Sequence, residues 1–147
     1  MALELTSPAF GDNEKIPSKY TCQGDDINPA LEIKNTPPET KTLCLIMDDP
    51  DAPVGSWNHW IIFDFRPTDQ ILEDSVPEGG MQGKNSWGRP DYGGPCPPSG
   101  THRYVFKLYA LNTQLNLEEG SRKRDIEDAM KGHIIEEAKL TGLYEKE

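Results

Sequence analysis

All thirteen prolines of this 147-residue chain, and most of its thirteen glycines, lie within the first hundred residues. Proline removes a backbone donor and blocks helix interiors, while glycine favours turns. Residues 1–100 are therefore divided into segments too short for long helices, and we expect strands joined by long loops. The length suits a single domain, 1–147, with one hydrophobic core.

Five segments have the composition of strands. Residues 42–47 form a short apolar run, which is typical of a central strand buried on both faces. Residues 59–65 form another run, rich in β-branched and aromatic side chains. Residues 3–7 and 30–34 alternate between apolar and polar side chains. Residues 103–111 alternate most regularly, and one face carries Tyr104, Phe106, Leu108 and Ala110.

A helix is predicted late in the chain. Ser121 is a suitable N-cap, and apolar residues then recur at helical spacing as far as Ala138. His133 falls on the apolar face of this helix, where we expect a structural role. Thr141 and Gly142 are expected to end the helix, with a short strand after them. These elements together predict a β-rich sandwich with a peripheral helix.

The formal net charge is −10. Such a charge repels nucleic acid and anionic membrane surfaces, so neither is an expected partner. No run of eighteen apolar residues is present, and membrane insertion is not expected. The first residues have no basic flank and no apolar core of a secretory signal, so a cytoplasmic location is the expectation. Any anion must be bound by local donors against the overall field.

The three cysteines, Cys22, Cys44 and Cys96, indicate neither a disulfide framework nor a zinc motif. Cys44 lies in an apolar run and is expected in the core. Cys22 and Cys96 lie in polar loops. Two exposed thiols and one disulfide are both open alternatives for this pair.

The loop that follows residues 42–47 is acidic and stiffened by two prolines. Pro50 and Pro53 fix their own φ angles and push the preceding residues into extended conformations. Asp51 is suited to close an Asx turn. Two interpretations follow for Asp49, which is nearest the strand end. It is either a turn residue facing water or a carboxylate that points into a pocket.

Two histidines open strands next to aromatic residues: His59 beside Trp60, and His102 near Tyr104. An imidazole can donate to an anion, and a nearby carboxylate fixes its tautomer. The loop before His102 contains Gly93, Gly94 and Cys96, whose backbone N–H groups would be free to cradle an anion if the loop lies outside a sheet. The alternative is a structural loop without a ligand.

Two longer motifs carry a resemblance to a known family. The first consists of Asp49-Pro50-Asp51-Ala52-Pro53 with His59-Trp60 after it. The second is Tyr92-x-Gly94-Pro95-x-Pro97-Pro98-x-Gly100-x-His102-Arg103-Tyr104, and it is highly specific. Both resemble the conserved blocks of the phosphatidylethanolamine-binding proteins, which include the Raf kinase inhibitor proteins. Residues 20–29 resemble a further family segment, with Asn28 where serine is usual. The length resembles the bacterial and archaeal branch.

The resemblance implies a mainly β fold: a Greek-key β-sandwich core with a few peripheral helices and a small pocket at one end. It implies that Asp49, His59 and His102 are the polar groups of an anion-binding pocket. The implied pocket walls are Trp57, Pro97, Pro98 and Tyr104, and the implied loop contacts are Gly94 and Cys96. The implied ligand is a phosphate-like anion or phosphorylated small molecule rather than a whole lipid.

Three functions follow from these residues. The first is a regulatory module that binds a phosphoryl headgroup. The second is an inhibitor of a protein kinase or protease that acts by direct contact with its target protein. The third is a hydrolase that uses the Asp, His, His set. No nucleophile elbow, phosphate loop or dinucleotide fingerprint is present, so catalysis, a metal and a cofactor are not expected. A homodimer is left open.

Overall fold

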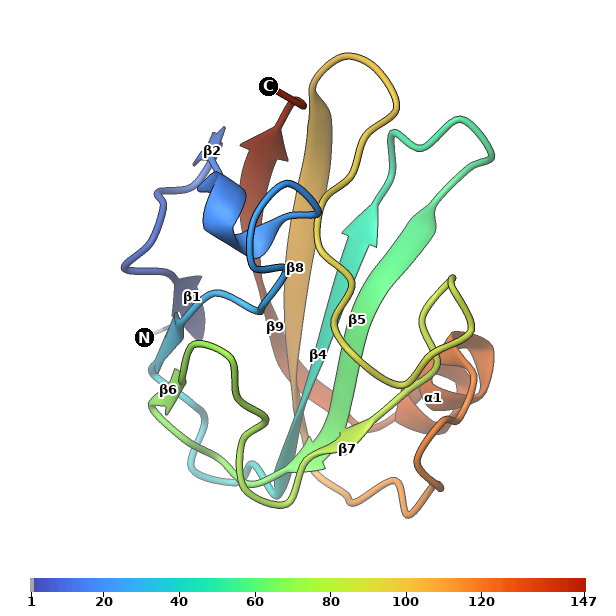
Figure 1. The fold of residues 1–147 in the computed structure, drawn as a ribbon. Helices are drawn as coiled ribbons and strands as arrows, with labels where there is room; N and C mark the ends of the chain where they lie inside the picture. The colour runs from blue at the N-terminus through green and yellow to red at the C-terminus, as the bar shows by residue number, and fades with distance from the viewer. Residues whose placement is uncertain (1) are drawn as a thin grey trace.

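The computed structural model describes residues 2–147 (Figure 1). A three-stranded antiparallel sheet has the order β1 (Glu4–Thr6), β3 (Leu31–Lys34) and β6 (Gln70–Ile71). A six-stranded sheet has the order β2 (Glu14–Lys15), β9 (Ile134–Tyr144), β8 (His102–Leu111), β4 (Thr42–Asp49), β5 (Trp57–Phe65) and β7 (Met81–Gln82). A 3-10 helix, η1 (Ser18–Tyr20), and an α-helix, α1 (Lys123–Met130), complete the regular structure.

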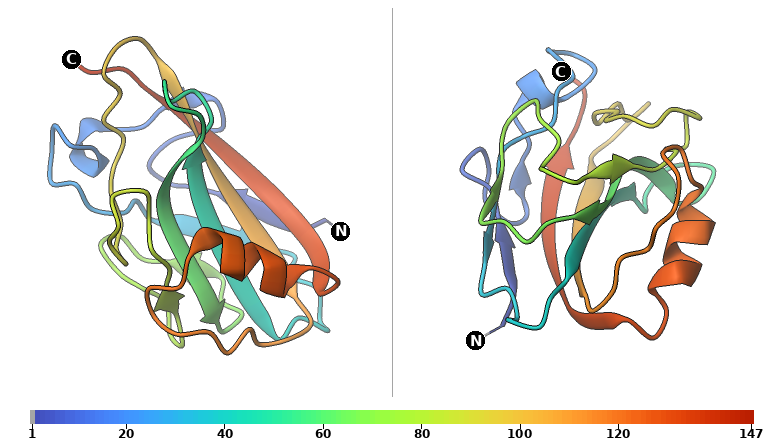
Figure 2. Two further views of the ribbon diagram at one scale, coloured as in Figure 1. Left: turned by 90° about the vertical axis from the view of Figure 1, so that its right-hand side faces the viewer. Right: turned by 90° about the horizontal axis from the view of Figure 1, so that it is seen from below.

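The six-stranded sheet is the middle layer of the molecule. The small sheet and its connections cover one face, and α1 covers the other (Figure 2). The larger core cluster lies between the two sheets and includes Leu5, Ile33, Leu45 and Phe106. A smaller cluster lies under α1, where Ile126 packs with residues of β4 and β5. The mainly β fold with two sheets is therefore confirmed, and burial of apolar surface on both faces stabilises the central sheet.

The central strands agree with their sequence patterns. Every residue of β4 is buried, as expected for a strand covered on both faces. On β8, the predicted inward face of Tyr104, Phe106, Leu108 and Ala110 is fully buried. The intervening residues from Arg103 to Tyr109 are exposed or half-buried. Period-two alternation therefore located the core face of β8.

The predicted helix is correct only in its first half. The α-helix ends at Met130, and Gly132 takes a left-handed conformation with φ of 80°. Residues 134–144 form the long strand β9, which pairs with β8 along almost its whole length. The helical spacing from Ile134 to Ala138 was misleading, because pairing with β8 satisfies the backbone groups of β-branched residues such as Ile134 and Ile135.

Two details of the helix prediction are corrected with it. Arg122, not Ser121, is the N-cap, and no side chain caps the helix. His133 lies beyond the helix and is exposed, with Nδ1 2.9 Å from Oδ1 of Asn112. It is therefore not a core histidine.

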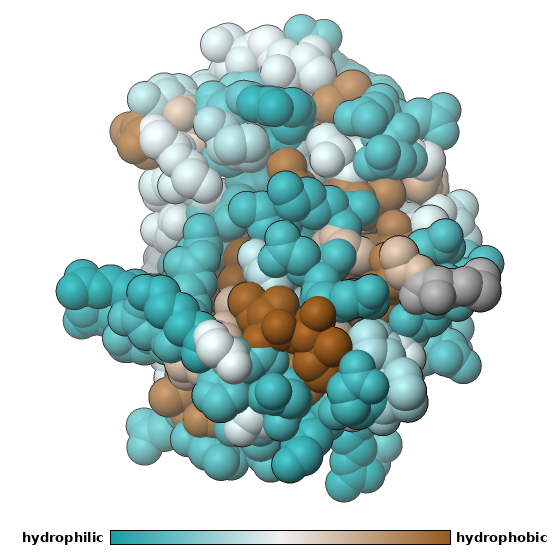
Figure 3. Space-filling view, turned by 180° about the vertical axis from the view of Figure 1, so that it is seen from behind, coloured by the Kyte–Doolittle hydropathy of each residue, from teal (hydrophilic) through white to brown (hydrophobic). Residues whose placement is uncertain are grey.

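The surface seen from behind is mostly hydrophilic, with a compact hydrophobic patch near its centre and smaller hydrophobic areas towards its edges (Figure 3). Across residues 2–147, the structure contains no helix with the length and apolar character needed to cross a membrane.

Candidate anion-binding site

The ends of three neighbouring strands, β8, β4 and β5, meet at one end of the six-stranded sheet. The end of β4 pairs with the start of β5, where Asp49 lies opposite Trp57. The same end of β4 pairs with the start of β8, where Asp48 lies opposite Val105. Antiparallel pairing therefore brings together Asp49, His59 and His102, which are far apart in sequence. Binding sites commonly form where loops leave a rigid sheet in this way.

A cavity of about 450 Å³ opens at this end of the sheet. All nine residues predicted from the sequence line it: Asp49, Trp57, His59, Gly94, Cys96, Pro97, Pro98, His102 and Tyr104. Their role in binding an anion remains a prediction.

A β-bulge in β5 gives His59 its orientation. Met47 pairs with Trp60 and Asp48 with Asn58, so His59 is an extra residue between these two pairs. Without the bulge, His59 would share the face of Ile61 and Phe63, which pack under α1. The extra residue brings the imidazole to the cavity side, an effect for which bulges near functional sites are known.

The His102 ring is held by Asp49. Nδ1 of His102 lies 2.7 Å from Oδ2 of Asp49, and both side chains are buried. Because a carboxylate only accepts hydrogen bonds, Nδ1 carries the proton. The other oxygen of Asp49 accepts the backbone N–H of Asp51 at 2.8 Å. The Asx turn in this loop is thus closed by Asp49 and not, as predicted, by Asp51.

Asp51 instead joins its loop to β8. Its carboxylate accepts hydrogen bonds from the Arg103 backbone N–H and from both Nε and Nη2 of the guanidinium, at 2.7–2.9 Å. These bonds lower the pKa of Asp51 to about 2. The pair fixes the entry of β8, and so supports the position of His102.

The His59 ring is held by the backbone. Its Nδ1 lies 2.8 Å from the carbonyl oxygen of Gly93, so Nδ1 donates here as well. Trp87 and Tyr104 contact the ring edge-on, with centroids 5.0 and 5.1 Å away. Burial lowers the pKa of His59, and the Gly93 carbonyl acts in the opposite direction more weakly.

Two of the three backbone donors that the sequence suggested in the loop before β8, those of Gly93 and Gly94, are not free. The backbone N–H of Gly93 donates to the His59 carbonyl at 3.0 Å. The backbone N–H of Gly94 donates to Oδ1 of Asp26 at 2.8 Å. A cradle built from these two N–H groups is therefore excluded. The loop acts as a wall that positions His59.

Both imidazoles are left with one open nitrogen. With Nδ1 committed, Nε2 of each ring has no hydrogen-bond partner within residues 2–147, and both rings line the cavity. Tyr104 lies against both rings, stacked on His102 and edge-on to His59. Burial raises the pKa of its hydroxyl. The two imidazoles therefore offer a ligand their Nε2 atoms.

Trp87 and Arg89 are among the cavity residues that sequence reasoning missed. Trp87 contacts both Trp57 and His59 edge-on. The guanidinium of Arg89 lies 5.7 Å from the Trp87 ring, and Arg89 brings a permanent positive charge to the cavity. Buried Asn85 organises this loop, because its Oδ1 accepts the N–H groups of both residues. A tryptophan followed directly by glycine, with a proline three residues after it, was the available signal.

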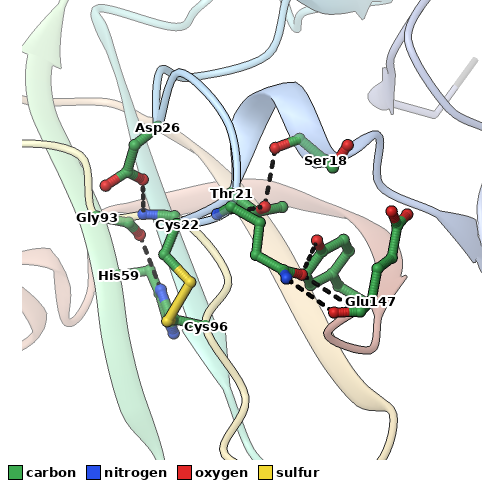
Figure 4. The surroundings of a disulfide bond; sticks show 11 residues. Ser18, Thr21, Cys22, Asp26, His59, Gly93, Cys96 and Glu147 are labelled. Carbon is green, nitrogen blue, oxygen red and sulfur yellow. Dashed lines mark hydrogen bonds between the residues drawn. A yellow bond between two sulfur atoms is a disulfide. The ribbon is translucent and has the colours of Figure 1, made fainter.

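Cys22 and Cys96 form a disulfide, which decides between the two alternatives for this pair. Both cysteines line the cavity, and Figure 4 shows the bond between them. Cys44 is free and fully buried, as expected for a core residue. No group of three or more His, Cys, Asp or Glu side chains within residues 2–147 is arranged to hold a metal ion.

Comparisons with known proteins agree with this geometry. The family model of the phosphatidylethanolamine-binding proteins matches residues 6–145. A UPF0098 protein of Methanothermobacter thermautotrophicus is 50% identical, with 98% of this chain and 99% of the relative covered. A UPF0098 protein of Pyrococcus horikoshii is 47% identical over 99% of this chain and 78% of its own length.

Two solved structures have the same fold. A Chlamydia trachomatis protein, described as a homologue of phosphatidylethanolamine-binding protein, superposes with a TM-score of 0.96 at 43% identity, and 99% of each chain is covered. Escherichia coli YbcL, described as a member of the mammalian family of these proteins, gives a TM-score of 0.92 at 27% identity over the whole of both chains. This chain therefore belongs to the phosphatidylethanolamine-binding protein family.

Proposed function

We propose that this protein is a binding module for a phosphoryl group, carried by free phosphate or by a small phosphomonoester, and that the group sits between His59 and His102. One observation carries the proposal: two buried imidazoles face one cavity, each with Nδ1 committed to the protein and Nε2 open.

The fixed tautomers determine what the cavity can bind. A neutral imidazole with its proton on Nδ1 presents a lone pair at Nε2, which repels a fully ionised oxygen. An anion can therefore bind only if an additional proton lies between Nε2 and the ligand oxygen. Either the imidazole is protonated, or an O–H of the ligand donates to Nε2. Phosphomonoesters have a second pKa of about 6, so the singly ionised form that carries such a proton is populated at weakly acidic pH.

The walls suit a small substituent on the phosphoryl group. Trp57, Trp87, Pro97 and Pro98 surround the two imidazoles with mainly apolar surface. The volume of about 450 Å³ lies in the usual range for small-molecule sites, roughly 300–1,000 Å³. We therefore expect the phosphoryl oxygens at the two Nε2 atoms and the organic part against the aromatic rim.

The cysteine chemistry supports binding rather than catalysis. Cys22 and Cys96, the two cysteines that line the cavity, are joined in the disulfide and present no free thiol. Cys44 is inaccessible, and burial raises the pKa of its thiol well above the ordinary value. The proposal accordingly includes no reaction step.

The test is calorimetric titration with inorganic phosphate and with phosphorylethanolamine. His102→Gln and His59→Gln remove the imidazoles and keep polar side chains of similar size. We expect each variant to lose roughly tenfold or more in affinity, as for a charge-assisted hydrogen bond of about 1.5–3 kcal/mol. His133→Gln, on an exposed residue outside the cavity, should bind as the unmodified protein does. Unchanged affinity in both pocket variants would reject the proposal.

A second candidate function is inhibition of a kinase or protease through direct contact. The observation that favours it is exposed apolar surface at the rim of the cavity. Val54 is 80% exposed there, and Trp87 is 42% exposed. A tryptophan contributes strongly to binding when a protein partner covers it. If a pull-down yields no partner while the same preparation binds phosphate, this candidate is disfavoured.

A further inference from the structure

The disulfide joins two segments that are remote in sequence and that share the cavity wall. Cys22 follows η1 and Cys96 lies in the loop before β8, with their Cα atoms 5.5 Å apart. Cys22 is exposed and Cys96 is half-buried. Figure 4 shows the bond next to His59, Gly93 and Asp26.

The wall segment connects the disulfide to a pocket imidazole. Cys96 is three residues from Gly93, whose carbonyl accepts the His59 Nδ1 hydrogen bond. Between them, the Pro95 carbonyl accepts the N–H of Cys22 at 3.1 Å and the Gly94 N–H donates to Asp26. Any displacement of Cys96 therefore acts on the group that orients His59.

We propose that the Cys22–Cys96 disulfide is a redox modification site for a thiol reductant, and that its state sets the anion affinity of the cavity. This inference rests on the proposed function for its second part. The co-reactant is a dithiol, such as a reductant protein of the thioredoxin class.

The reaction is ordinary thiol–disulfide exchange. A thiolate of the reductant attacks the exposed Sγ of Cys22, the Cys22–Cys96 bond breaks, and Cys96 leaves as a thiolate that takes up a proton. The second thiolate of the reductant then attacks its own sulfur in the mixed disulfide. Cys22 is released and protonated, so two electrons pass to the protein and the reductant becomes a disulfide.

Reduction should weaken anion binding because the wall loses its covalent connection to the Cys22 segment. The hydrogen bonds of the Gly94 and Cys22 N–H groups remain, so the fold itself should persist. These bonds alone leave the Gly93 carbonyl more freedom, and His59 is then less preorganised for the ligand.

The experiment compares phosphate titrations of the oxidised protein and of protein treated with dithiothreitol, with thiols counted by alkylation and mass spectrometry. We expect two new thiols and an affinity lower by at least about fivefold, the lower end of typical coupling between sites. Cys44→Ala, which keeps the disulfide, should respond as the unmodified protein does. Cys22→Ser/Cys96→Ser should be weak with or without reductant. Equal affinity in both redox states would overturn the proposal, as would a disulfide that resists the dithiol under native conditions.

A readout without ligand separates this inference from the proposed function. Imidazole NMR signals of His59 should shift on reduction, because its Nδ1 partner moves, while those of exposed His133 should not. If phosphate fails to bind in either state, the proposed function fails. The His59 signals then decide alone: a shift confined to His59 supports a redox site that reshapes the cavity, and no shift rejects it.

Discussion

The two pocket histidines are held differently, since Nδ1 of His59 donates to a backbone carbonyl and Nδ1 of His102 to a buried carboxylate. His59 has no direct anionic partner, and burial lowers its pKa. A ligand anion at Nε2 would supply the missing negative charge. Anion binding at His59 should therefore be coupled to protonation of this ring.

Sulfate tests this coupling, because its charge does not change near neutral pH and it carries no O–H to donate. Its affinity should rise as pH falls from 8 to 5, by up to about tenfold per pH unit for one coupled proton. Phosphate affinity should change less, because phosphate itself becomes protonated near about pH 6. Calorimetry across this range measures both. Sulfate binding that is independent of pH would contradict the coupling.

The same pKa shift predicts a pH effect on stability without ligand. Because the folded-state pKa of His59 is lowered, its contribution is complete above the ordinary histidine pKa of about 6.5 and is lost as pH falls below it. Sulfate should oppose this loss by binding the protonated ring. Thermal denaturation at pH 5, with and without sulfate, measures the effect. In His59→Gln, the stability should lack the part of its pH dependence that sulfate suppresses in the unmodified protein.

The orientation of His59 shows what residue patterns could not predict. Strict alternation places it with Ile61 and Phe63, on the α1 side of the sheet. Only the bulge opposite Met47 and Asp48 reverses this. His59 entered the predicted site through its place at a strand start beside aromatic residues, and the family motif supported it, but neither indicated the bulge. Trp87 lies outside both motifs and was missed for that reason.

At the scale of elements, the contact between the Cys22 segment and the loop before β8 requires glycine at position 94. A Cβ atom there would lie 2.4 Å from both the Tyr20 carbonyl oxygen and Oδ1 of Asp26. Since backbone is involved, the loop would have to move. The predicted Gly93 and Gly94 donors were wrong because the Gly93 N–H donates to the His59 carbonyl of β5 and the Gly94 N–H to Asp26 of the neighbouring loop. No sequence pattern records these partners.

Gly94→Ala should destabilise the protein by about 1–3 kcal/mol, as overpacking does in tight sites. It should also weaken phosphate binding, because the displaced loop carries the Gly93 carbonyl. Urea denaturation and calorimetry measure the two effects. Ser99→Ala, in the exposed part of the same loop, is the matched control and should change neither. Full stability of Gly94→Ala would show that the two loops are not in close contact.

The end of α1 gives the clearest difference between sequence and structure at this scale. The helical spacing of apolar residues continues past Gly132, but Gly132 has φ of 80° and β9 begins at Ile134. Local periodicity could not predict this, because the partner strand β8 lies more than twenty residues earlier. The strands 42–47 and 103–111 could be predicted, because the apolar run of the first and the alternation of the second are both local features of the sequence.

Gly132→Ala tests the left-handed turn. No atom lies within 4 Å of a Cβ placed there, so the cost is conformational and should be about 1–2 kcal/mol. Lys131→Ala, beside it and exposed, should cost less than about 0.5 kcal/mol. Equilibrium urea denaturation compares the two. A stabilised Gly132→Ala protein would indicate that the helix continues through this position, as the sequence pattern alone suggested.

At the scale of the whole molecule, the residues that stabilise the sandwich are separate from those that form the site. The core between the sheets lies along β4 and β8, while the cavity lies at the ends of the same strands. The rigid sheet thus sets the positions of Asp49 and His102 without those residues filling the core. The net charge of −10 opposes anion approach over the whole surface, so affinity has to come from these local contacts.

Phe106→Ala and His102→Gln should therefore separate fold from site. Phe106 is fully buried between the sheets, and its truncation should cost about 3–5 kcal/mol through the cavity left behind. His102→Gln leaves an amide donor within reach of Asp49, so its loss of stability should stay below about 2 kcal/mol, while phosphate affinity falls sharply. Urea denaturation and calorimetry on both variants give the comparison. If His102→Gln instead unfolds the protein as Phe106→Ala is expected to, the Asp49–His102 pair belongs to the core, and its place at the cavity is incidental.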